Sequence, residues 1–246
     1  MLFERRRFLQ SALALPLLAA KRAPPGVDWN KWFHDWLSRD FGMIGYYAED
    51  NAKLLASKAP VDIVFMGDSI TEGWMDKRPG FFTPGRVDRG IGGQTTPQMV
   101  LRMMSDVVAL KPRAVQLMAG TNDIAGNTGP MTAEMTQNNF REMSDIARRN
   151  GIKVIFASIP PAAGFPWAPR IETRRPIAEM NAWLKRYAAD TGAAWVDYHQ
   201  VLDDGTGAMK PGLASDGVHP TAAGYDAMAT LVEPVLERVL REHRRS

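Results

Sequence analysis

The feature that most constrains the fold is an alternation of two apolar patterns between Val61 and the C-terminus. Short apolar runs rich in β-branched residues alternate with longer stretches in which apolar residues recur at helical spacing. The predicted strands span 61–66, 87–91, 114–118, 153–159 and 194–198, and the predicted helices span roughly 97–110, 132–149, 172–190 and 221–241. Such alternation is typical of a parallel sheet covered by helices on both faces. We therefore predict a three-layer α/β/α domain with about five parallel strands.

Length and composition fit one such domain. The chain has 246 residues, and we divide it into 1–23, a signal segment, 24–58, a linker with an amphipathic helical segment, and 59–246, the α/β domain. The net charge is only +3, and much of the basic excess lies at the two ends, so the chain lacks the long basic face that nucleic-acid binding requires. The absence of cysteine excludes disulfides and thiolate nucleophiles.

The first residues have the pattern of an export signal. Arg5-Arg6-Arg7 precedes a short apolar run, 11–20, and the Arg-Arg-x-Phe-Leu core resembles a twin-arginine signal. We expect an exported protein, periplasmic or secreted. The alternative is a basic terminus with an incidental apolar patch. Because neither 18–20 nor 21–23 forms a clean cleavage site, retention of the signal as a membrane anchor stays open, and it is the only membrane contact we expect.

An aromatic stripe follows the Pro24-Pro25-Gly26 linker. Its members recur at helical spacing: Trp29, Trp32, Phe33, Trp36 and Leu37. The polar face mixes acidic and basic residues, whereas a membrane-surface helix is rich in lysine and arginine. We expect this helix to pack against the α/β domain or a second subunit.

Three glycine-containing segments follow the first three predicted strands: Gly67-Asp68-Ser69, Gly90-Ile91-Gly92-Gly93 and Gly120-Thr121-Asn122-Asp123. In open α/β sheets the ligand site lies outside the carboxyl ends of the strands. These segments should therefore meet at one edge of the sheet.

Ser69, His219 and Asp216 provide a nucleophile, a base and an orienting carboxylate. A spacing of three residues lets one turn present Asp216 to one imidazole nitrogen while the other faces the serine. A serine between a strand and a helix is often only an N-cap. Here a helix that begins near Ile70 would also aim N–H groups at the site. Position 71 is Thr71, so the segment is not the G-x-S-x-G motif of ordinary α/β-hydrolases.

Serine, glycine, asparagine and histidine in this order resemble the SGNH family of GDSL-type esterases and lipases, from about Val61 to the C-terminus. The Gly-Ile-Gly-Gly-x-Thr-Thr segment is especially similar to the platelet-activating-factor acetylhydrolase catalytic subunits. The resemblance implies a flavodoxin-like strand order. It also implies an oxyanion hole made by the N–H groups of Ser69 and Gly93 and the side chain of Asn122.

Together these features predict a serine esterase that needs no metal or other cofactor. The resemblance favours short acyl esters, such as acetyl esters of carbohydrates or small alcohols, as substrates. The alternatives are a lysophospholipase or thioesterase with the same triad, and a non-catalytic binding module. Phe165 and Trp167, in the proline-rich loop 159–170, either offer apolar surface to the substrate or pack inward. The oligomeric state stays open.

Overall fold

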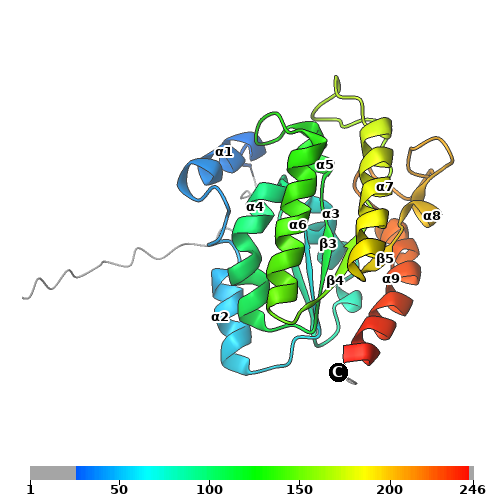
Figure 1. Ribbon diagram of the computed structural model, residues 1–246. Helices are drawn as coiled ribbons and strands as arrows, with labels where there is room; N and C mark the ends of the chain where they lie inside the picture. Colours follow the sequence, from blue (N-terminus) through cyan, green and yellow to red (C-terminus); the bar gives the residue numbers. More distant parts are fainter. Residues whose placement is uncertain (1–25, 244–246) are drawn as a thin grey trace, which may run out of the picture.

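All five strands among the described residues, 26–243 of this computed structural model, run parallel in one sheet (Figure 1). The strands are β1 (Ile63–Gly67), β2 (Arg86–Gly90), β3 (Ala114–Met118), β4 (Lys153–Ala157) and β5 (Ala194–Val196). Their order is β2-β1-β3-β4-β5. This is the flavodoxin-like order, so the predicted fold class is confirmed.

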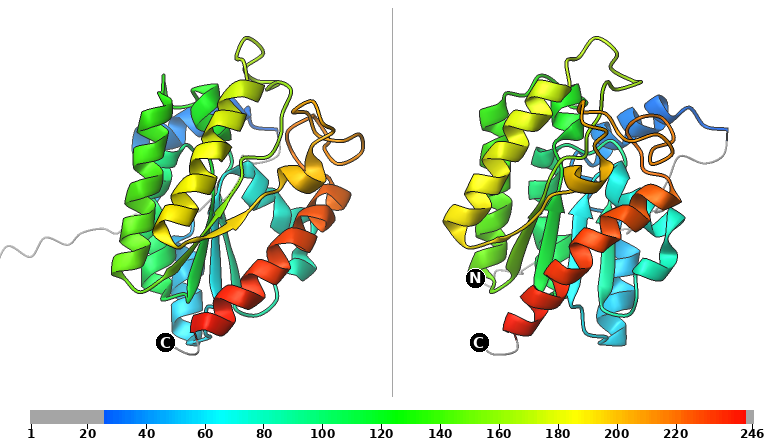
Figure 2. Two further views of the ribbon diagram at one scale, coloured as in Figure 1. Left: turned by 45° about the vertical axis from the view of Figure 1, so that its right-hand side comes forward. Right: turned by 90° about the vertical axis from the view of Figure 1, so that its right-hand side faces the viewer.

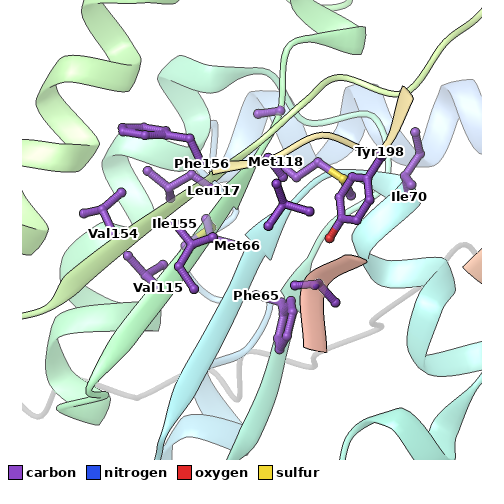
Figure 3. Packing of buried hydrophobic residues seen from close by; sticks show 14 of the residues in the cluster. Phe65, Met66, Ile70, Val115, Leu117, Met118, Val154, Ile155, Phe156 and Tyr198 are labelled. Carbon is purple, nitrogen blue, oxygen red and sulfur yellow. The ribbon is translucent and has the colours of Figure 1, made fainter. Parts of the chain in front are cut away.

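The central strands β1 and β3 are apolar apart from Gln116, as expected for strands that helices cover on both sides. Every residue of β1 and β3 is buried, and side chains of these strands pack with those of β4 and neighbouring elements in the core, part of which Figure 3 shows. The edge strand β2 is less regular, since it contains Asp88 and Arg89. The Arg89 guanidinium lies over the ring of Tyr47, 4.6 Å from its centroid, and donates to Asn51 Oδ1. Residues that precede the sheet thus cover this edge.

Helices form the two outer layers (Figure 2). α4 (Thr96–Arg102), α6 (Ala133–Arg149) and α7 (Arg174–Thr191) cover one face, and α3 (Ser69–Lys77) and α9 (Ala222–His243) cover the other. Thr132 caps α6 by accepting from Met135 N, and Gly192 ends α7 with a left-handed φ of 70°. The helix predicted at 97–110 continues past α4 as a π-helical turn, η2 (Met103–Val107), and a 3₁₀ turn, η3 (Val108–Leu110).

The remaining helices and turns lie around the sheet. They are α1 (Trp29–Arg39), α2 (Ala48–Ser57), η1 (Pro79–Phe81), α5 (Thr121–Ala125) and α8 (His199–Leu202). The aromatic stripe predicted for 29–37 lies on α1, which sits at the same end of the sheet as α5 (Figure 1). No helix within 26–243 is both long and apolar enough to cross a bilayer. The predicted signal, 1–23, lies outside the described residues.

Candidate active site

Ser69 lies where β1 passes directly into α3. Asp68 is the N-cap of this helix, and its Oδ1 accepts from Ile70 N at 2.9 Å. The turn depends on Gly67, because a Cβ there would lie 2.0 Å from Thr71 Oγ1. Ser69 is thus held at a helix N-terminus, where the helix dipole favours negative charge.

The structure brings Ser69, His219 and Asp216 together. Ser69 Oγ lies 2.9 Å from His219 Nε2, and His219 Nδ1 lies 2.7 Å from Asp216 Oδ2. The other carboxylate oxygen, Oδ1, accepts from the backbone N–H groups of Val218 at 3.0 Å and His219 at 2.8 Å. One four-residue turn therefore holds the carboxylate against Nδ1 of the imidazole, and Nε2 on the other side of the ring contacts Ser69 Oγ.

The charge state of Asp216 sets the tautomer of His219. Partial burial raises the pKa of the Asp216 carboxyl, but hydrogen bonds from His219 and Val218 outweigh it and hold that pKa below its usual value. Asp216 is therefore ionised at neutral pH and accepts a hydrogen bond from Nδ1–H. Nε2 is left with its lone pair toward Ser69, which is the arrangement that a general base needs.

The residues predicted to form the oxyanion hole gather beside this pair. Gly93 has a φ of +77°, which the Gly92-Gly93 turn requires. Within residues 26–243, the N–H groups of Ser69 and Gly93 donate to no protein acceptor. Asn122 Nδ2 donates one hydrogen to Gln94 O at 3.0 Å and keeps a second. Its Oδ1 accepts from Asn127 Nδ2 at 2.9 Å, which fixes the orientation of the amide.

A cavity of about 430 Å³ connects these groups. The catalytic residues of its lining come from α3, the β2–α4 and β3–α6 segments and the loop before α9. α1 supplies both aromatic and polar residues, and the loop after β4 supplies Trp167. The residues that line it are Trp29, Asn30, Phe33, His34, Ser69, Glu72, Gly92, Gly93, Asn122, Asn127, Trp167 and His219.

Trp167 and Phe165, the two candidate rim residues, differ in position. Trp167 lines the cavity, with its ring centroid 5.9 Å from that of His219. Phe165 is buried, with 1% of its surface exposed, and stacks beneath Trp167 at 5.2 Å. The inward alternative therefore holds for Phe165, and the substrate-facing placement predicted for it is wrong. Burial of its ring leaves only the tryptophan at the surface.

Two carboxylates near the motifs brace loops. Asp123 is buried and accepts from Thr96 N at 3.0 Å and from Thr136 Oγ1 at 3.2 Å. Burial raises its pKa, and these hydrogen bonds oppose that effect. Asp68, the N-cap, is also buried, which raises its pKa to about 6. Among residues 26–243, no group of three His, Asp or Glu side chains is arranged to hold a metal ion.

Three contributors to the site were missed from the sequence. The α1 stripe was expected to pack on the domain, but nothing in its spacing showed that Trp29 and Phe33 reach the Gly93 loop. Glu72 lies one turn after Ser69, and its carboxylate accepts from Tyr46 OH at 2.6 Å and Gly92 N at 2.9 Å. Asn127 lies in a polar turn where a local role was the default expectation.

Comparison with known proteins relates the chain to GDSL-type acylhydrolases. The profile of the GDSL-like lipase/acylhydrolase family matches residues 65–227. The structure resembles that of a proposed acylhydrolase from Bacteroides fragilis, with 41% sequence identity and a TM-score of 0.79. That match covers 82% of this chain and 99% of the other. No curated protein matches the chain.

Two more distant structures share the fold. A proposed platelet activating factor from Streptococcus pneumonia is 23% identical, with a TM-score of 0.70; the match covers 84% of this chain and 97% of the other. An acetylxylan esterase from Geobacillus stearothermophilus is 20% identical, with a TM-score of 0.57 and coverage of 72% and 94%.

Proposed function

This chain belongs to the GDSL-like lipase/acylhydrolase family, as its motifs predicted, and we propose that it is a serine esterase that hydrolyses carboxylic esters through an acyl-enzyme. One observation carries the proposal: the continuous set of contacts from Ser69 Oγ through both nitrogens of His219 to Asp216. A non-catalytic binding module would not need these three groups in this order.

The proposed reaction has two proton-transfer cycles. Ser69 Oγ attacks the ester carbonyl while His219 Nε2 takes its proton, and the carbonyl oxygen becomes an oxyanion facing the N–H donors of Ser69, Gly93 and Asn122. When the tetrahedral intermediate collapses, the C–O bond to the alcohol breaks and His219 returns the proton to the departing oxygen. Water then attacks the acyl-enzyme by the same route, releasing the acid and restoring Ser69.

The proposed substrates are short acyl esters, such as acetyl esters of carbohydrates or small alcohols. The described lining of the cavity includes no lysine or arginine that could pair with a phosphate, and it contains the carboxylate of Glu72. These features disfavour a lysophospholipid. The acetylxylan esterase that shares the fold acts on an ester of the proposed kind.

Ser69→Ala tests the proposal directly. We expect this change to lower kcat on nitrophenyl acetate by at least about 10³-fold, because triad members act as a unit. Ser57→Ala, an exposed serine on α2, is the matched control and should leave kcat unchanged.

A series of nitrophenyl esters with lengthening acyl chains would show the highest kcat/KM for acetyl. Wild-type activity that survives in Ser69→Ala would refute the mechanism, and a preference for long chains would instead support a lysophospholipase or thioesterase.

A further inference from the structure

Two exposed tryptophans line the cavity that contains Ser69 and His219, and each stacks on a phenylalanine. Trp29 is 43% exposed and stacks on Phe33, with centroids 4.8 Å apart and planes 12° apart. Trp167 is 41% exposed and stacks on Phe165 at 5.2 Å and 12°. Both phenylalanines are buried. A tryptophan held in this way offers an apolar face whose orientation is fixed before a ligand arrives, which lowers the entropy cost of binding.

Trp29 reaches the cavity because α1 begins at a defined point. Asp28 caps the helix by accepting from Lys31 N at 2.8 Å, which places Trp29 in the first turn. The Trp29 ring lies against the Gly93 loop, since a Cβ on Gly93 would lie 2.8 Å from Trp29 Cη2. The family profile matches residues 65–227, so α1 lies outside the matched region.

Polar groups lie among these aromatic rings. Asn30, His34 and Asn127 line the same cavity, and Glu72 presents a carboxylate held by Tyr46 OH and Gly92 N. An alkyl chain bound here would cover the side chains of Asn30 and His34 without replacing their hydrogen bonds to water, at a cost in free energy. A pyranose ring fits both features, because its C–H face is apolar and its edge carries hydroxyl groups.

We propose that the alcohol half of the substrate is an acetylated pyranose, and that Trp29 and Trp167 bind its ring while the acetyl group lies at Ser69. This inference rests on the proposed esterase function and names the substrate class of that site. Trp29 is then a specificity residue contributed by α1, and Asn30 and His34 are the hydroxyl partners on the same helix.

The experiment compares two acetates on the full-length protein. One is acetylated methyl β-D-xylopyranoside, and the other is hexyl acetate, which lacks a ring and hydroxyl groups. We expect Trp29→Ala to raise KM for the pyranoside acetate about 3- to 10-fold, and to raise KM for hexyl acetate by a smaller factor. Trp29→Phe keeps an aromatic face and should recover most of the loss. Phe41→Ala is the matched control, because Phe41 is 44% exposed and lies outside the cavity.

Binding of the unacetylated methyl β-D-xylopyranoside, followed by saturation-transfer NMR, gives a readout independent of catalysis. The wild type and Ser69→Ala should bind the sugar, and Trp29→Ala should bind it more weakly. The inference is overturned if Trp29→Ala lowers kcat equally on both esters, since Trp29 would then only brace Gly93, or if the sugar binds wild type and Trp29→Ala alike. Hydrolysis of neither ester by the wild type would refute the proposed function, whereas failure of the wild type to bind the sugar, with esterase activity intact, refutes only this inference.

Discussion

At the scale of single residues, Asn127 connects the aromatic wall to the oxyanion hole. Its Nδ2 donates to Asn122 Oδ1 at 2.9 Å and to Gly93 O at 3.1 Å, and its Oδ1 accepts from Trp167 Nε1 at 3.2 Å. Asn127 thereby holds the Asn122 amide with its nitrogen, and not its oxygen, available as a donor. It is a positioning residue, because it acts through Asn122 and Gly93.

We predict that Asn127→Ala lowers kcat about 10-fold with little change in KM. Loss of an oxyanion donor itself typically lowers kcat by about 10²–10³-fold, and a misoriented amide should produce only part of that decrease. Asn127→Asp should be at least as damaging, because a carboxylate cannot donate to Asn122 Oδ1. The measurement is steady-state kinetics on nitrophenyl acetate. An effect confined to KM would make Asn127 a substrate contact.

Asp88 is a buried carboxyl whose ionisation opposes folding. Its Oδ1 accepts from Gly90 N at 2.6 Å, and its Oδ2 has no partner among the described residues. Burial raises its pKa from 3.8 to about 8; Glu72 and Asp76 add to this rise, and the Gly90 N–H and Arg89 oppose it. A carboxyl with a raised pKa in the folded state takes up a proton on folding. Its contribution to stability therefore falls as the pH rises from about 4 to 8.

Asp88→Asn should remove this dependence, because the amide keeps an acceptor for Gly90 and cannot ionise. Urea denaturation of both proteins at pH 5 and pH 9 measures the effect. At each pH, the free energy of unfolding of wild type is subtracted from that of Asp88→Asn. We expect this difference to be larger at pH 9 than at pH 5 by at least about 1.4 kcal/mol, the equivalent of one pKa unit. Equal changes in both proteins would contradict the raised pKa.

At the scale of elements, a buried ion pair joins α2, α4 and β2. Arg102 is fully buried and donates to Asp106 Oδ2 at 2.7 Å, Gln94 Oε1 at 2.8 Å and Arg89 O at 3.0 Å. Asn51, on α2, donates to the other Asp106 oxygen at 2.7 Å. Arg102 ends α4, and Asp106 lies in the π-helical turn that follows. Every charged atom of the pair therefore has a partner.

We predict that Arg102→Ala lowers the free energy of unfolding by about 3–5 kcal/mol, because it leaves the Asp106 carboxylate buried without its cation. Arg175→Ala, an exposed arginine on α7, should stay within about 0.5 kcal/mol of wild type. The double variant Arg102→Met/Asp106→Leu replaces both charges by apolar side chains, and its free energy of unfolding should lie much closer to that of wild type than that of Arg102→Ala does. Chemical denaturation checks all three, and a mild effect of Arg102→Ala would show that the pair contributes little to stability.

The same segment shows what sequence patterns can and cannot predict. Apolar spacing over 97–110 predicts a helix there, but not the π-helical turn after α4, where Asp106 and Arg102 contact Asn51 and Arg89 O, which are distant in sequence. The buried strands β1 and β3 were predictable, because a strand covered on both faces is a continuous apolar run. The Asp216–His219 pair was predictable because three residues form one turn. Asn127 and Trp29 were not, since only the folded chain brings them to Asn122 and Gly93.

At the scale of the whole molecule, the segment predicted to be an export signal, 1–23, precedes every residue that the structure describes. We propose that the Arg-Arg-x-Phe-Leu core directs the folded protein out of the cytoplasm. The described cavity lining begins at Trp29, so removal of 1–23 would leave each of those residues in the chain. An esterase outside the cytoplasm would meet cell-wall and environmental esters, which agrees with an acetylated carbohydrate as substrate.

Replacing Arg5 and Arg6 by lysine tests the route, because the change keeps the positive charge and removes only the arginine pair. A twin-arginine route should fail or slow sharply, whereas a general secretory route would tolerate the substitution. The measurement is the share of esterase activity and of cleaved protein in the periplasmic or secreted fraction of the native host. Trp29→Ala, with an intact signal, is the control for changes that affect the site but not transport. Uncleaved wild-type protein that stays in the cytoplasm would refute export and remove the support that location gives to a carbohydrate substrate.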